Sequence, residues 1–276
     1  MNITQLIWTC PKCGADLSPA GNAFRCPAGH SYDRAKEGYV NLLLSQTGGT
    51  HGDNREMIAA RRAFLDLGYY DPLADALIRR VSADLPQGGV VLDGGAGEGF
   101  YTDRLTRALQ AAGKDPAVFA FDISKEAVRF FSKRNRDVSL AVAGVYQMPV
   151  RTGSVDAALN FFAPLAAGEI WRVLKPHGRF YMAIPEREHL FGLKAAIYDT
   201  PYKNTVADPA LPGFALVGND EIRYAVTLRT AEEIRALFAM TPYAYRTGEE
   251  GRARLEALQT LTTELHFRLF TYEKLI

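Results

Sequence analysis

The sequence has few cysteines and no long apolar run, and each shortage excludes a class of protein. Three cysteines occur among 276 residues, all within the first 26. An odd number of cysteines at one end of the chain is not the disulfide framework of a small secreted protein. No stretch of 18 apolar residues occurs, and the start lacks the charged and apolar segments of a signal peptide. We therefore expect a soluble cytoplasmic protein with no membrane partner.

An excess of charge of one sign is also missing. The chain has 32 basic and 31 acidic residues, a formal net charge of +1. The total charge therefore gives no reason to expect a nucleic acid or a membrane surface, and any site for a polyanion must be a local patch. With 47% hydrophobic and 11% aromatic residues, the chain can bury a core, which excludes disorder as its main state.

The cysteines and one histidine have the spacing of a zinc site. Two residues separate Cys10 from Cys13, and three separate Cys26 from His30. Two such pairs on short turns can surround one tetrahedral zinc ion, which prefers thiolate and imidazole ligands. No fifth ligand or open position is evident, so the four residues predict a closed, structural site. The alternative, three buried cysteines and an unrelated surface histidine, is disfavoured by the spacing.

A segment rich in Gly and Thr separates this module from the rest of the chain. Residues 46–53 contain few apolar side chains and are typical of a connector. A capping box over 53–56 predicts a helix that ends near Gly68, and a second helix is expected over about 72–83. The predicted division is a zinc-binding module over 1–45, a connector and helical segment over 46–85, and a larger domain over 86–276.

Short apolar runs alternate with helical stretches from Val90 onward. This is the pattern of a parallel sheet with crossover helices, and runs that are apolar throughout predict strands covered on both faces. The runs occupy residues 90–92, 118–122, 139–143, 155–161 and 179–184. Two later runs, 224–228 and 265–272, alternate and predict antiparallel strands at the sheet edge. The predicted fold class is α/β, a doubly wound sheet with a small N-terminal zinc-ribbon module.

The turn after the first of these strands carries a cofactor signal. Asp93 lies at the strand end, and Phe100 directly precedes the helix expected over 101–111. Four of the six residues between them are glycines, and Gly95, Gly97 and Gly99 form an alternating G-x-G-x-G pattern. Glycines there let the backbone approach a ligand, and Asp122, at the end of the next strand, can accept both hydroxyls of a ribose. Together these residues predict an adenosine cofactor.

The identity of that cofactor follows from the charge of the loop. No Gly-Lys-Ser or Gly-Lys-Thr is present for a triphosphate, and Asp93 would repel a pyrophosphate. The same carboxylate can hold the amino-acid end of S-adenosylmethionine, directly or through water. The loop resembles motif I of the class I methyltransferases, and residues 173–178 resemble the turn into their fifth strand. The alternative is an ordinary turn that needs glycine for its geometry.

The order of these motifs resembles that of the bacterial 23S ribosomal RNA guanine-N1 methyltransferases, which include housekeeping and tylosin-resistance enzymes. The resemblance covers essentially the whole chain. Its further segments are residues 35–42, 61–70, 160–164, 189–194 and 240–244. It implies a Rossmann-like class I methyltransferase fold, zinc at the four ligands above, and cofactor contacts at Tyr70, Gly99, Phe100 and His189. Without the family, Tyr70 is equally explained as a core aromatic and His189 as a solvated loop residue.

Four residues at the end of the fourth strand are candidates for the acceptor pocket. They are Asn160, Phe161, Phe162 and Pro164. A guanine exposes N1 only when it is unpaired or flipped from its stack, and a flat base can stack on aromatic side chains. The alternative is that these aromatics belong to the core. The sequence does not identify the base that removes the N1 proton.

The expected function is methyl transfer from S-adenosylmethionine to N1 of a guanine in a 23S ribosomal RNA hairpin. The alternatives are a small-molecule methyltransferase that keeps the zinc module, and a noncatalytic RNA-binding protein on a methyltransferase scaffold. Two basic clusters could bind RNA phosphates, one with Arg61 and one with Arg129 and Arg134, although most such clusters are solvated faces. The sequence leaves open which guanine is chosen, macrolide resistance and assembly into a homodimer.

Overall fold

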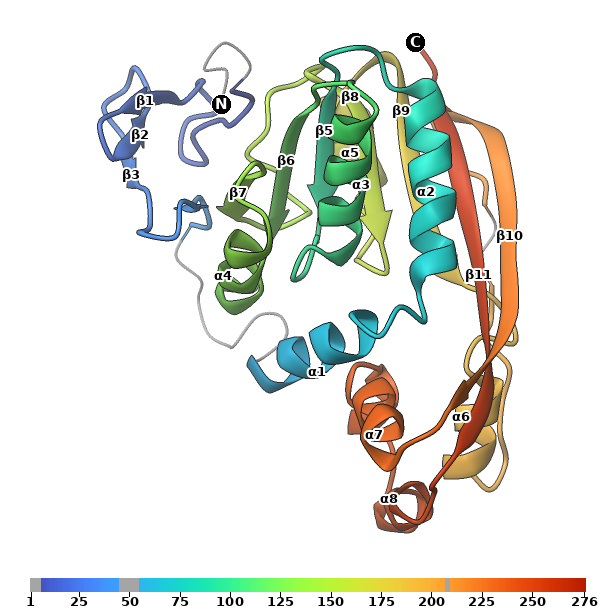
Figure 1. Ribbon diagram of the computed structural model, residues 1–276. Coiled ribbons are helices and arrows are strands. Elements are labelled where there is room, and N and C mark those ends of the chain that lie inside the picture. Colours follow the sequence, from blue (N-terminus) through green and yellow to red (C-terminus); the bar gives the residue numbers. More distant parts are fainter. Residues whose placement is uncertain (1–5, 45–54, 207–208) are drawn as a thin grey trace.

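The computed structural model describes residues 6–44, 55–206 and 209–276. The predicted connector over 46–53 and the start of the capping box lie outside these residues. Figure 1 shows one large twisted sheet with helices packed on it, a small β module beside one edge, and a helical lobe at the far end of a long hairpin.

The large sheet has the predicted doubly wound core and antiparallel edge. Its strand order is β10-β11-β9-β8-β5-β6-β7-β4. The five predicted parallel strands are β5 (Val90–Gly94), β6 (Ala117–Asp122), β7 (Ser139–Val142), β8 (Val155–Phe161) and β9 (Leu174–Pro185). β10 (Phe214–Leu228) and β11 (Leu261–Lys274) form the predicted antiparallel pair, and β11 is antiparallel to β9. The predicted fold class is therefore confirmed.

Helices cover one face of this sheet. They are α2 (Asp71–Asp84), α3 (Phe100–Ala111) and α4 (Lys125–Arg134). Side chains alternate between faces along a strand, so Val91 joins the buried cluster with these helices while Val90 and Leu92 join the cluster on the other face. α1 (Arg55–Leu65) crosses below the carboxyl ends of the parallel strands (Figure 1).

The other face is covered by α5 (Ala167–Val173) and by the N-terminal module. Residues 143–154 join β7 to β8 without a helix. The module fills the space that a crossover helix would cover, since Trp8 is fully buried with its ring 5.5 Å from that of Phe119. The Trp8 indole N–H also donates to Ser139 Oγ at 3.0 Å.

The module is a small antiparallel sheet that is attached to the large one. Its strands are β1 (Ser18–Ala20), β2 (Ala23–Arg25) and β3 (Ser31–Asp33). β4 (Val40–Asn41) then pairs with β7 and becomes the last parallel strand of the large sheet. The module therefore shares a buried core with the sheet. The division at 45/46 and 85/86 stays a prediction.

A helical lobe lies beyond the carboxyl ends of the parallel strands. It contains α6 (Phe191–Ile197), α7 (Ala231–Ala239), a 3-10 turn (Pro242–Tyr245) and α8 (Glu249–Glu256). α7 packs against α1, and α6 packs against β11 and α8. The lobe and α1 together close the space below the strand ends (Figure 1).

Replacement of Trp8 by alanine should destabilise the whole protein, because the indole is buried between the module and the sheet. We expect Trp8→Ala to lower the free energy of unfolding by about 3–5 kcal/mol. Urea denaturation at fixed zinc concentration measures this. Leu67→Ala, at a half-exposed position, serves as the control and should cost less than about 0.5 kcal/mol. Equal losses in the two variants would contradict the packing role of Trp8.

Candidate functional site

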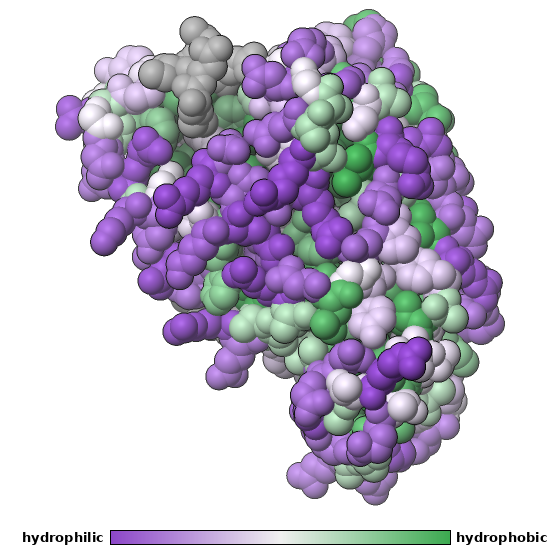
Figure 2. All heavy atoms as spheres, in the orientation of Figure 1, coloured by the Kyte–Doolittle hydropathy of each residue, from purple (hydrophilic) through white to green (hydrophobic). Residues whose placement is uncertain are grey.

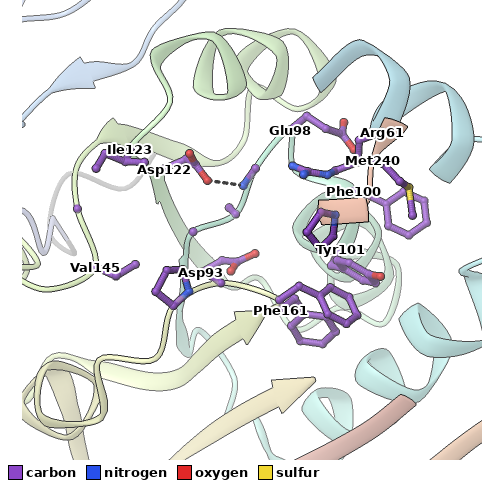
Figure 3. Close-up of a pocket in the computed structure, with 18 of the residues that line it drawn as sticks. Arg61, Asp93, Glu98, Phe100, Tyr101, Asp122, Ile123, Val145, Phe161 and Met240 are labelled. Atoms are coloured by element: carbon purple, nitrogen blue, oxygen red, sulfur yellow. Dashed lines mark hydrogen bonds between the residues drawn. The ribbon is translucent and has the colours of Figure 1, made fainter. Parts of the chain in front are cut away.

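A cavity of about 1030 Å³ lies where the parallel strands end. Its walls come from the turns after β5, β6, β7 and β8, from α1, and from the helical lobe. Figure 3 shows Asp93 and Asp122 entering it from the strand ends, with Arg61 on the side opposite Ile123 and Val145. Figure 2 shows hydrophobic surface gathered at the same level, between the body of the sheet and the lobe.

The glycine loop lies against this cavity in a backbone conformation that favours glycine. Gly95, Gly97 and Gly99 have φ of 80°, 58° and 85°. A Cβ at Gly95 would lie 2.6 Å from Ala163 Cβ, and one at Gly99 would overlap the Phe131 ring. A Cβ at Gly97 would have only Arg61 Nη1 nearby, at 3.8 Å. Gly97 therefore presents bare backbone to the cavity, as a loop that cradles a ligand must.

Asp122 is held in place by the loop it faces. Its Oδ2 accepts from the Gly97 N–H at 2.9 Å, and its Oδ1 accepts from the Ser124 N–H at 2.8 Å. These bonds orient the carboxylate at the mouth of the turn (Figure 3). Carboxylate oxygens have further lone pairs, so the arrangement fits the ribose of a nucleoside.

Asp93 has a different environment, because it is almost fully buried. Its Oδ2 accepts from the Thr102 hydroxyl at 2.5 Å, and its Oδ1 has no hydrogen-bond partner among the described residues. Burial raises the pKa of this carboxyl to about 7, with a further contribution from the charge of Asp122. A buried carboxylate oxygen that lacks a donor suits a cationic ligand, such as the ammonium group of an amino acid.

Tyr70 and His189 lie side by side in the wall of the cavity. His189 Nδ1 accepts from the backbone N–H of His266 at 3.3 Å, so its proton lies on Nε2, which is 3.5 Å from the Tyr70 hydroxyl. Burial, aided by the charge of Lys194, lowers the pKa of His189 to about 3, and the ring is therefore neutral. The predicted alternative of a solvated loop histidine is wrong, since His189 is buried.

The aromatic residues after β8 lie beside the glycine loop. Phe161 is buried with its ring 4.5 Å from that of Tyr101, whereas Phe162 is 46% exposed. Phe162 has a φ of 58°, a left-handed conformation that is rare outside glycine and costs about 1 kcal/mol or more. Both rings and Pro164 line the cavity. Asn160 is not among the lining residues, because its amide donates to the Pro164 carbonyl at 3.1 Å and shapes the turn.

The four predicted zinc ligands converge at a second site. Their ligand atoms all lie within 4.8 Å of one another. Cys10 and Cys26 Sγ each lie 3.4 Å from His30 Nδ1, and Cys13 Sγ lies 3.7 Å from Cys26 Sγ. Tetrahedral zinc with bonds of about 2.0–2.3 Å requires ligand atoms about 3.4–3.8 Å apart. The cluster therefore fits a zinc ion.

Comparison with known proteins agrees with both sites. Residues 8–48 match a family model described as "RlmA, N-terminal", and residues 92–182 match one described as "Methyltransferase domain". The 23S rRNA (guanine(748)-N(1))-methyltransferase of Streptomyces fradiae is 34% identical over 255 residues, which cover 89% of this chain and 88% of the relative. The chain belongs to the 23S rRNA (guanine-N1)-methyltransferase family.

Other relatives of this methyltransferase agree. A Micromonospora griseorubida protein that carries a provisional name of the same kind is 34% identical over 289 residues, with 95% and 96% of the two chains covered. A solved structure from Anaeromyxobacter dehalogenans, provisionally described as a type II methyltransferase, shares the fold at a TM-score of 0.50 and 20% identity, covering 72% of this chain and 96% of its own. S-adenosylmethionine and a structural zinc ion are thus the cofactors.

The two basic clusters have different environments. Arg134 is only 12% exposed and pairs with Glu98 at 2.7 Å and with Asp66 at 3.0 Å, and Arg129 pairs with Glu37 at 3.1 Å. The guanidinium groups of Arg129 and Arg134 are therefore engaged in ion pairs, and an RNA contact at this cluster stays a prediction. Arg61 instead lines the donor cavity. No helix of the described ranges is both long and apolar enough to cross a membrane.

Asp93 should make the stability of this methyltransferase depend on pH. Its pKa is about 7 in the folded protein and about 4 when unfolded. The folded state therefore holds a proton that the unfolded chain has released, and the free energy of unfolding falls as the pH rises from about 4 to 7. Asp93→Asn should reduce this fall and raise the melting temperature at pH 7, while donor affinity drops about tenfold or more.

Calorimetric melting between pH 4 and 7 and a donor titration measure these effects. The exposed Asp115→Asn variant is the control and should change neither quantity. An Asp93→Asn variant that binds the donor as tightly as wild type would refute the ammonium contact.

Removal of the zinc should weaken donor binding as well as the fold. Pro11, between two of the ligands, and Leu42 to Leu44, at the end of the module, line the donor cavity. We expect one zinc per chain by metal analysis, easier extraction by a chelator from His30→Ala, and several-fold weaker donor binding after extraction. His177→Ala, which changes an exposed histidine, should behave as wild type. Full donor affinity in the metal-free protein would argue against a contribution of the zinc module to the donor-binding cavity.

Proposed function

We propose that this methyltransferase transfers a methyl group from S-adenosylmethionine to N1 of a guanine in a 23S ribosomal RNA hairpin. The observation that carries the proposal is the single cavity, in which charged groups suited to the donor lie next to exposed aromatic rings suited to a base. The relative from Streptomyces fradiae is named for this reaction at guanine 748. Which guanine this chain modifies is not part of the proposal.

The donor would be held at both ends. Asp122 would accept the ribose hydroxyls, and the backbone from Gly95 to Gly99, with Phe100 behind it, would lie against the donor. Asp93 would bind the ammonium group of the donor, and Arg61 across the cavity would bind its carboxylate. Each charged group of the donor's amino-acid part would thus face a side chain of opposite charge. Tyr70 and His189 would close the wall as neutral hydrogen-bonding groups. The donor supplies a methyl group on a sulfonium centre, ready for in-line displacement.

The acceptor would enter beside Phe162. Methyl transfer depends chiefly on holding the acceptor nitrogen about 3 Å from the methyl carbon. Because N1 is on the pairing edge, the guanine must leave its stack before it can enter the cavity. The half-exposed Phe162 ring offers a stacking surface at the mouth, and the left-handed backbone that presents it is consistent with a strained functional position.

The zinc ribbon would have a structural role. Cys10, Cys13, Cys26 and His30 would hold the metal, and the metal would keep Trp8 and Pro11 in position against the sheet and the cavity. So small a module cannot fold on its own core, and metal binding supplies part of its folding energy. The three-part division of the chain, cytoplasmic location and assembly into a homodimer remain predictions that this proposal does not need.

Labelled donor tests the proposal directly. The protein is incubated with labelled S-adenosylmethionine and an unmodified 23S rRNA hairpin, and separately with small-molecule acceptors. Methylation of N1 blocks pairing, so reverse transcription should stop one nucleotide before the modified guanine. Label in small acceptors alone would indicate a small-molecule enzyme. Binding of RNA without any label transfer would indicate a noncatalytic RNA-binding protein.

Loss of the Phe162 ring should reduce turnover and leave donor binding intact. We expect Phe162→Ala to lower the single-turnover rate on the hairpin by tenfold or more, since base stacking contributes about 1–3 kcal/mol per ring. Donor affinity, measured by calorimetry, should stay within about twofold of wild type. Leu67→Ala, which is exposed away from the cavity lining, should change neither value. An unchanged rate in Phe162→Ala would remove this residue from the acceptor site.

A further inference from the structure

One charged side chain inside the protein has no role in the function described so far. Lys194, on α6, is fully buried. Among the described residues no carboxylate forms a salt bridge with it. A buried charge without a counter-ion is costly, and burial accordingly lowers the pKa of this ammonium. The presence of a lysine at this buried position therefore needs a physical explanation.

The partners of Lys194 belong to the wall of the cavity. Its Nζ donates to the Tyr202 carbonyl at 3.2 Å and to Asn204 Oδ1 at 2.5 Å. The ring centroids of Tyr202 and Tyr243 lie 4.6 and 5.4 Å from the same nitrogen. All three partner residues line the cavity, whereas Lys194 itself does not. The ammonium group thus lies directly behind a wall that joins two segments far apart in the sequence.

Asn204 extends this network and leaves little freedom in the wall. Its side-chain amide donates to the Glu186 carbonyl at 2.8 Å, and its backbone N–H donates to the Arg187 carbonyl at 2.9 Å. The segment that follows α6 is therefore tied to the end of β9 through one side chain. Without the ammonium group, Asn204 Oδ1 and the Tyr202 carbonyl would lose their common donor.

The order of the strands in the sheet places this wall on the side of the cavity where the acceptor would bind. Along the sheet the order is β6, β5, β8 and β9. Asp122 follows β6 and Asp93 ends β5, so the donor's ribose and amino-acid groups would occupy that side. The aromatic turn follows β8, and the wall of Tyr202 and Asn204 comes after β9. A base stacked on Phe162 would therefore have this wall on its side away from the donor's ribose.

We propose that Lys194 is the positioning residue of the acceptor pocket: it fixes Tyr202, Asn204 and Tyr243 as one wall and directs a positive charge toward the guanine there. This inference rests on the proposed function. Guanine becomes nucleophilic when N1 loses its proton, and the negative charge then spreads over N1 and O6. A fixed positive charge held behind the wall stabilises that anion without touching it. The proton itself leaves to solvent or to a base that Lys194 does not supply.

Other charged and titratable groups face the same region, and the test must separate them. His189 is neutral, and His266 lies behind it. Tyr198 packs against both Tyr202 and Tyr243. Arg61 and Arg246 also line the cavity. At the surface, Lys203 pairs with Glu188 and Arg254 with Asp199, and water screens these exposed pairs.

Three variants test the inference. Lys194→Met keeps an unbranched side chain that is one atom shorter and removes the charge. Asn204→Asp places a carboxylate beside Nζ and cancels the charge, and it also removes the amide that donates to the Glu186 carbonyl. Lys203→Met is the matched control, because it removes a neighbouring lysine that is half exposed and absent from the cavity lining.

The measurement is the single-turnover rate on the unmodified hairpin at saturating donor, from pH 6 to 9.5. Removal of the positive charge disfavours the N1 anion, so the rise of the rate with pH should shift upward by about one unit in the first two variants. The rate at pH 7 should fall about tenfold and recover at high pH. Donor affinity should stay within about twofold of wild type, and Lys203→Met should follow the wild-type curve.

The outcomes are distinct. A uniform loss of rate without a shift of the pH curve would mean that Lys194 only stabilises the fold, and it would overturn the inference. If Lys194→Met does not fold, an unshifted curve in Asn204→Asp overturns the inference equally. Wild-type protein that methylates no guanine N1 would refute the proposed function and this inference with it. Wild-type activity with unshifted variants would refute the inference alone.

Discussion

The hydrogen bond from the Gly97 N–H to the Asp122 carboxylate connects the two strand ends on which the site depends. Parallel strands end at a common edge, and the loops beyond them would otherwise be independent. This bond joins the turn after β5 to the end of β6, and the positive φ of the three loop glycines makes the close approach feasible. Asp93 and Phe162 then occupy neighbouring turns of the same edge. The proposed donor and acceptor sites would be adjacent because the sheet makes their strands adjacent.

The zinc ribbon solves a packing problem of this sheet. Parallel strands need cover on both faces, yet the connection between β7 and β8 contains no helix over residues 143–154. Trp8 packs on Phe119 in its place, and β4 extends the sheet beside β7. Because the metal orders the segment that carries Trp8 and Pro11, a site distant from the chemistry contributes to the shape of the cavity. The zinc module thus takes part both in the buried interface with the sheet and in the wall of the cavity.

The patterns in the sequence predicted the buried strands better than the edge. β5, β6 and β8 lie near their predicted positions because strands covered on both faces must be apolar throughout. Only 224–228 of β10 was predicted, although the strand begins at Phe214. Asn219 and Asp220 lie on this edge strand, where polar side chains reach water, so the first half has no apolar pattern. The ion pairs of Arg134 were not predicted, because a buried ion pair and a solvated arginine have the same local sequence.

The sequence by itself determined the zinc ligands, the glycine loop and its acidic partner. These depend on short spacings and on backbone conformations that few residue types adopt. Only the tertiary structure decided that Arg61, Tyr70 and His189 share a cavity, that Asn160 shapes a turn, and that Lys194 is buried behind three residues of the cavity wall. Burial and electrostatic environment are set by neighbours from distant segments, such as Tyr202 and Tyr243 around one ammonium group. No local sequence pattern specifies these contacts, because they form only when the chain has folded.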